Sequence, residues 1–119
     1  MKIVTQVLDG VYGKSAVGIR ARLARADDNG WTMVAEAETN TNGCIENWDT
    51  RRLERGLYRI VFDSDSYFAG FGGAAAYPEV MAVFRMLDES YAFQVQVTLA
   101  PYSYSMYFGT VDDQRGNWQ

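Results

Sequence analysis

A thiol and a carboxylate two residues apart, those of Cys44 and Glu46, form a pair whose types and spacing permit chemistry. A cysteine becomes a nucleophile when its pKa, about 8.5 in a free thiol, is lowered. Residues two apart on a continuous strand share a face, so Glu46 is the nearest candidate base. A lone cysteine is also a common small apolar filler of protein interiors, so a structural role for Cys44 stays open.

The chain contains no histidine. Histidine is the usual general base near neutral pH and the commonest transition-metal ligand, so its absence argues against a zinc centre and against ordinary acid/base catalysis. No metal or other cofactor is expected. Cys44 is the only cysteine, which excludes an intramolecular disulfide. The N-terminus turns polar too early for a signal peptide, and these features together predict a reducing, cytoplasmic location.

A second chemical feature is an uncharged segment: residues 91–111 include no Asp, Glu, Lys or Arg. Glutamine, proline, serine and threonine within this segment make it a poor membrane helix. A strand face with neutral polar groups and no charge to oppose edge pairing favours burial against another subunit or around a ligand. A subunit interface is the simpler interpretation of the residues by themselves.

The elements that must position these residues are predicted to be strands, because apolar residues recur with period two between Gly, Asn and Asp. Phe93, Val95, Val97 and Leu99 share one face of such a strand. Shorter alternating runs occur at 3–8, 19–23, 31–35, 58–62 and 80–84, with Trp31, Met33 and Ala35 expected on one side. Turns are expected at 27–30 and 42–43, and one short, glycine-weakened helix within 65–76. About eight strands predict an all-β sandwich.

The 119 residues fit a single globular domain with 48% hydrophobic residues and a net charge of −4. The charges form no basic stripe, so nucleic acid is not an expected partner. No membrane partner is expected either.

A series of short motifs occurs along residues 2–110: Val7-Leu8-Asp9, Asp28-Asn29-Gly30-Trp31, Thr39-Asn40, Asn42-Gly43, Gly56-Leu57-Tyr58-Arg59, Phe62, Tyr67-Phe68, Tyr77-Pro78-Glu79-Val80 and Leu99-Ala100-Pro101-Tyr102-Ser103-Tyr104-Ser105-Met106-Tyr107-Phe108-Gly109-Thr110. In register, these motifs resemble those of the transthyretin-like family, which includes the 5-hydroxyisourate hydrolases. The resemblance implies a sandwich of two four-stranded sheets with a short helix, spanning 1–110, and a tail at 111–119. It also implies a homotetramer, a dimer of dimers, with pockets between dimers lined by the first, seventh and eighth strands.

The chain departs from the hydrolase subgroup at the polar pocket positions. The subgroup has a His on the first strand and a His on the seventh, where this chain has Gln6 and Gln94. It has an Arg after the Asn/Asp-Gly turn, where this chain has Cys44. Near the end it has Tyr-Arg-Gly-Ser, where this chain has Tyr107-Phe108-Gly109-Thr110. Glutamine donates and accepts hydrogen bonds but takes no proton at neutral pH, so it cannot activate water as histidine does.

The resemblance therefore implies a divergent hydrolase-like protein with a repurposed small-molecule pocket. Gln6, Gln94 and Tyr107, with Cys44, are the candidate catalytic residues, acting by positioning and hydrogen bonding. Candidate substrate-binding residues are Glu46, Ser105, Phe108, Gly109 and Thr110. Cyclisation, isomerisation or ring opening of a heterocyclic or polycyclic intermediate of specialised metabolism would suit such a pocket.

Three alternatives stay open. The protein is a non-catalytic carrier of a small aromatic ligand, a hydrolase of 5-hydroxyisourate or a modified analogue, or a scaffold with a closed interface. The tail adds a further hypothesis, in which Arg115 supplies a cation and Trp118 a lid over the pocket.

Overall fold

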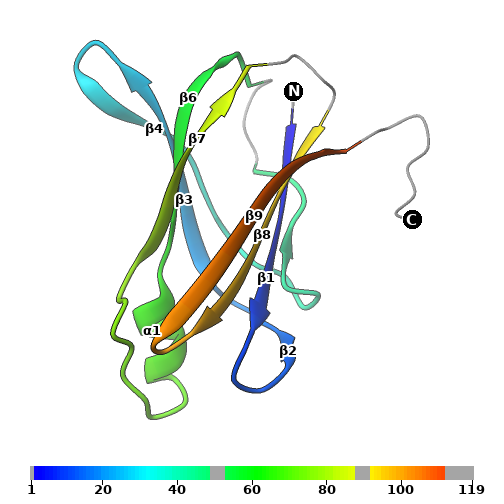
Figure 1. Cartoon of the computed structure of the whole chain (residues 1–119), viewed down its shortest axis with the longest axis vertical. Coiled ribbons are helices and arrows are strands. Elements are labelled where there is room, and N and C mark those ends of the chain that lie inside the picture. The colour runs from blue at the N-terminus through cyan, green and yellow to red at the C-terminus, as the bar shows by residue number, and fades with distance from the viewer. Residues whose placement is uncertain (1, 49–52, 88–91, 112–119) are drawn as a thin grey trace.

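The computed structural model describes residues 2–48, 53–87 and 92–111, and two β-sheets pack face to face in it (Figure 1). The elements in chain order are β1 (Lys2–Asp9), β2 (Lys14–Ser15), β3 (Arg20–Asp27), β4 (Gly30–Glu38), β5 (Cys44–Ile45), β6 (Gly56–Phe62), α1 (Ser64–Ala69), β7 (Val80–Met86), β8 (Ala92–Ala100) and β9 (Ser103–Val111). The expected all-β sandwich is confirmed.

Each sheet has a path of four strands. One has the order β2-β1-β8-β9, and the two-residue strand β5 pairs with β1 as a fifth member. The other has the order β4-β3-β6-β7. β1 and β8 run parallel although 82 residues separate the ends of the two strands, while the other strand pairs are antiparallel. Residues from the two ends of the chain therefore lie side by side in the first sheet.

The core lies between the sheets and follows the period-two pattern of the sequence. Phe93, Val95, Val97 and Leu99 of β8 are all buried, and they share the interior with Leu23, Ile60 and Phe62 of the facing sheet. Burying such a side chain contributes about 1.5–3 kcal/mol. This burial fixes which face of β8 points inward, so Gln94, Gln96 and Thr98 must lie on its other face.

Both predicted turns are confirmed, and each uses a glycine in the left-handed region. Gly30 has φ 115° at the β3–β4 turn, and Gly43 has φ 75° just before β5. The Asn40 side chain stabilises the second turn, because its Oδ1 accepts hydrogen bonds from the backbone N–H groups of Asn42 (2.9 Å) and Cys44 (3.0 Å). This turn delivers Cys44 to the edge of β1.

The predicted short helix is confirmed as α1. The Asp63 carboxylate caps its start, accepting hydrogen bonds from the backbone N–H (3.1 Å) and hydroxyl (2.8 Å) of Ser66. The run Gly70–Gly73 follows its last residue. No helix in the described parts of the chain is long and apolar enough to cross a membrane.

The expectation that Trp31, Met33 and Ala35 share one side is wrong. The β3–β4 register shifts between Leu23 and Ala24, which pair with Ala35 and Met33 respectively, so Val34 is an extra residue in β4. Such a bulge reverses the alternation beyond it. Ala35 packs on the core, whereas Trp31 and Met33 are exposed on the opposite side.

Candidate functional site

The side of the first sheet that faces away from the core carries the candidate site. Strand register places its side chains in cross-strand rows, because paired residues share a face, and three central rows form the site, with Lys2 and Ala92 one row beyond Val4. The rows are Val4–Gln94–Gly109, Cys44–Gln6–Gln96–Tyr107 and Leu8–Thr98–Ser105. We call these ten residues the glutamine face; none of them is Asp, Glu, Lys, Arg or His.

The central row brings two glutamine amides into contact. Gln96 Nε2 donates a hydrogen bond of 3.3 Å to Gln6 Oε1, and both side chains are half-buried. Gln6 is also the cross-strand partner of Cys44. Gln94, the other glutamine among the candidate catalytic residues, pairs with Val4 and lies one row away. The resemblance did not single out Gln96, although its spacing of two residues from Gln94 places both glutamines on one face of β8.

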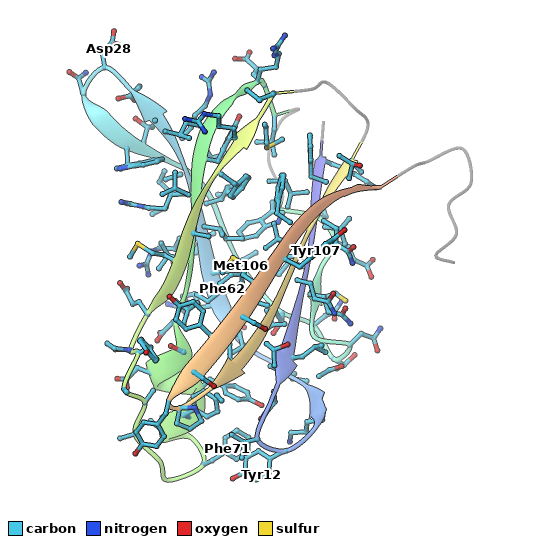
Figure 2. The ribbon with its side chains drawn as sticks, viewed as in Figure 1. Tyr12, Asp28, Phe62, Phe71, Met106 and Tyr107 are labelled. Atoms are coloured by element: carbon cyan, nitrogen blue, oxygen red, sulfur yellow. The ribbon has the colours of Figure 1, made fainter. Side chains whose placement is uncertain are left out.

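Tyr107 is 58% exposed and lies at the β9 end of the central row, on the opposite side of β9 from Met106 (Figure 2). Its ring folds over Gly109: a Cβ built on Gly109 would meet the ring carbons Cζ and Cε1 at 2.8 and 2.9 Å. Gly109 pairs with Gln94, so the absence of a side chain there leaves room for the phenol beside the Gln94 row. Within the described residues the Tyr107 hydroxyl has no hydrogen-bond partner, so its donor is available to a ligand.

Cys44 is half-buried beside Gln6, and its Sγ donates a 3.6 Å hydrogen bond to the Asn42 carbonyl. Burial, and secondly the negative charge of Glu46, raise the pKa of the Cys44 thiol. The thiol is therefore protonated at neutral pH. The predicted partner Glu46 is exposed just beyond β5, and its charge opposes formation of the thiolate that a nucleophile requires.

Two of the predicted substrate-binding residues lie on the other side of β9. Phe108 pairs with Val95, and its ring lies 5.3 Å from that of Phe93 and 4.8 Å from that of Phe84. Thr110 pairs with Phe93 and shares its side of the sheet. The fold therefore brings Ser105 and Gly109, but neither Phe108 nor Thr110, to the glutamine face, because successive strand residues point to opposite faces.

A hollow of about 410 Å³ adjoins the glutamine face at the β1–β2 end. Leu8 and Thr98 belong to both, and Lys14 and Ser15 of β2 complete one wall. The Lys14 ammonium is held over the rings of Tyr12 (5.7 Å) and Phe71 (5.1 Å). The third row thus ends beside a cavity whose lining includes both Lys14 and the acidic residue Asp9.

No group of three metal-ligating side chains gathers within 2–48, 53–87 and 92–111. The tail residues Arg115 and Trp118, predicted to supply a cation and a lid, lie outside the described residues.

The parallel β1–β8 pair in a two-sheet sandwich, with a neutral polar face over β1, β8 and β9, defines a transthyretin-like architecture. The family model for the HIUase/Transthyretin family matches residues 3–109. The chain belongs to this family, which the sequence motifs had indicated.

Similar proteins carry two kinds of name. The 5-hydroxyisourate hydrolase of Deinococcus radiodurans is 36% identical over 113 residues, covering 91% of this chain and 95% of the relative. That of Mus musculus is 32% identical over 111 residues, covering 91% and 94%. The crystal structure of Sparus aurata transthyretin superposes on this chain with a TM-score of 0.86 at 25% identity, covering 92% of this chain and 97% of the transthyretin. A sea bream transthyretin in complex with thyroxine also gives a TM-score of 0.86 at 25% identity, covering 92% of this chain and 95% of the transthyretin.

Proposed function

We propose that the glutamine face binds a small uncharged heterocycle and promotes its ring opening, isomerisation or cyclisation without a metal or cofactor. We also propose that this heterocycle is an intermediate of specialised metabolism. The observation that carries it is the contact between Gln96 and Gln6 in the middle of a face with no charged side chain.

That contact leaves complementary groups free. Because Gln96 donates to Gln6 Oε1, the Gln6 NH₂ group and the Gln96 carbonyl oxygen have no other partner within the described residues and remain to bind a ligand. A donor and an acceptor side by side match the N–H and C=O edge of a cyclic amide, imide or ureide. A site of this kind rejects molecules that lack those groups, since its own half-buried polar atoms would be left unpaired.

Tyr107 supplies the group best suited to stabilise developing negative charge. Its phenol donates a hydrogen bond to an oxyanion formed at a ring carbonyl, and such a donor is worth about 10²–10³ in rate in other enzymes. Glutamine and a protonated thiol take no proton at neutral pH. Proton transfers must therefore occur within the substrate or through water, which favours cyclisations, isomerisations and ring openings of activated rings.

The same proposal includes the homotetramer. Residues 91–111 form most of the glutamine face and bring no charge to it, so a second copy of the chain can cover it without burying an unpaired ion. A small-molecule cavity then lies between the copies, with equivalent rows on both sides.

Two other functions have specific support. A carrier is supported by the absence of a titratable base on the face and by the similarity to a transthyretin solved with thyroxine. Hydrolysis of 5-hydroxyisourate or a modified analogue is supported by relatives of that name matching 91% of the chain.

One assay separates these functions. The chain is incubated with uncharged cyclic ureides and imides, including freshly prepared 5-hydroxyisourate, and products are followed by mass spectrometry against buffer. We expect conversion of at least one ring, lowered tenfold or more in Gln96→Ala and Tyr107→Phe but unchanged in Tyr102→Phe, a matched tyrosine at the exposed β8–β9 turn.

Binding without conversion would instead identify a carrier. The proposed chemistry would be contradicted if the chain converted 5-hydroxyisourate as fast as the Deinococcus radiodurans hydrolase does and if that rate changed with pH near neutrality.

A further inference from the structure

A second hollow lies on the opposite side of the molecule from the glutamine face. It has a volume of about 150 Å³ and lies on the outer side of the β4-β3-β6-β7 sheet. Arg22, Arg59, Trp31 and Met33 are among its lining residues. We call it the arginine hollow.

The bulge at Val34 creates this hollow. It turns Trp31 and Met33 outward beyond the register shift, opposite Ala26 and Ala24 of β3. The small alanine side chains leave space between the taller residues of β4 and β6, and Arg59, the partner of Ala24 on β6, occupies the far wall. A regular β4 would instead turn Met33 and Trp31 toward the core, away from the face that carries Arg59.

Arg59 is held against an aromatic ring and has no negative partner among the residues that the structure describes. Its guanidinium carbon lies 4.7 Å from the centroid of the Trp31 ring. Its Nε is buried and has no hydrogen-bond partner in the described part of the chain. None of the ion pairs among the described residues includes Arg59, whereas Arg22 is paired with Glu79 at 2.9 Å.

The charged residues around Arg59 on the outer face of this sheet leave its guanidinium available to bind an anion. On β7 its cross-strand partner is Val83, and the adjacent row places Arg85 on the same face. On β4, Glu36 is paired across the ladder with Arg22, which also has Glu79. Among the described residues, the acidic groups of this face thus lie near Arg22, whereas Arg59 and Arg85 have no acidic partner.

We propose that the arginine hollow binds a small planar organic carboxylate. A guanidinium presents two parallel N–H donors that match a carboxylate in a bidentate pair. Trp31, Met33 and Val61 provide apolar walls for the rest of the ligand. A cavity of about 150 Å³ accommodates a single aromatic ring.

Benzoate is a suitable probe, and uncharged benzamide is its matched control. Binding is followed by the NMR signal of the Trp31 indole N–H, assigned with Trp31→Phe. We expect benzoate to shift this signal in a saturable manner, with weaker binding at higher salt, and benzamide to bind at least tenfold more weakly.

Variants assign the effect to Arg59. Arg59→Gln should weaken benzoate binding at least tenfold, and Arg59→Lys should recover only part of it because the fork geometry is lost. Arg20→Gln is the matched control, since Arg20 pairs with Glu38 at 3.6 Å and does not line the hollow. Circular dichroism verifies that the variants are folded.

Equal binding of benzoate and benzamide, or unchanged benzoate binding in Arg59→Gln, would overturn the proposal. So would a Trp31 signal that depends on protein concentration and not on benzoate, because a second copy of the chain would then occupy the hollow.

Discussion

The sequence predicts the positions of some side chains of the glutamine face better than those of others. The family motifs single out both Cys44 and Gln6, which are cross-strand partners, whereas the contact of Gln6 with Gln96 is found only from the parallel register of β1 and β8. Alternation predicts which residues share a face but not which row they occupy. The same limit explains Phe108, whose motif position is adjacent to Tyr107 but whose side chain packs near Phe93.

The first prediction concerns Cys44. Because burial and the Glu46 charge raise the pKa of its thiol, alkylation by iodoacetamide at neutral pH should be slower than in the same chain unfolded in guanidinium. Glu46→Gln should move the midpoint of the rate-against-pH curve downward, since one of the two causes is removed. A folded-state thiol that reacts faster than the unfolded one would show that Cys44 is an activated nucleophile.

The second prediction concerns Tyr67, whose hydroxyl donates a 2.7 Å hydrogen bond to the buried carboxylate of Asp9. Burial, then this bond and the Asp9 charge, raise the Tyr67 pKa far above its ordinary value of about 10. The folded state therefore disfavours the phenolate. Stability is fully present below about pH 10 and falls as pH rises from there toward the folded-state pKa, because the unfolded chain ionises first.

Tyr67→Phe should lower the free energy of unfolding by about 1.5–3 kcal/mol at neutral pH and flatten the alkaline decline. Chemical denaturation at pH 7 and about pH 11 measures both effects. Tyr102→Phe, at a 77% exposed position, is the control and should change neither. Equal alkaline declines in wild type and Tyr67→Phe would contradict the assignment to Tyr67.

At the scale of elements, turn residues and alternation predicted most strands and the short helix, because those signals are local. The bulge in β4 was not predictable from the alternation, since Trp31, Met33 and Ala35 satisfy a regular strand equally well. Only the pairing of Leu23 with Ala35 and Ala24 with Met33 reveals the extra residue. The arginine hollow depends on this tertiary choice and so has no counterpart in the sequence pattern.

The third prediction tests the turn that positions Cys44. Gly43 has φ 75°, and an added Cβ would lie 2.7 Å from the Val7 carbonyl oxygen and 2.9 Å from Ser15 Cβ. Gly43→Ala should therefore cost about 3 kcal/mol or more, combining backbone strain with a clash. Gly30→Ala is the control: φ is 115° there, but nothing lies within 4 Å, so only the strain of about 1–3 kcal/mol applies. Thermal unfolding compares them, and equal losses would contradict the proposed clash.

At the scale of the whole molecule, the sequence motifs predicted the family and the two-sheet arrangement.

The proposed assembly provides the fourth prediction. Light scattering on the intact chain should give about four times the 13.4 kDa mass of one copy. Thr98→Glu, which adds a charge to the glutamine face, should lower that mass, whereas Val83→Glu on the opposite sheet should not. A monomer at high protein concentration would contradict the assembly.

The most direct test of the central claim is the pH dependence of ligand binding at the glutamine face. Allantoin, an uncharged cyclic ureide, is titrated into the protein at pH 5, 6.5 and 8 while the side-chain amide signals of Gln6 and Gln96 are followed by NMR. The neutral face predicts saturable shifts of both amide signals, with a dissociation constant that stays within about twofold over this range. A tenfold change in affinity with pH, or shifts confined to residues outside the glutamine face, would contradict it.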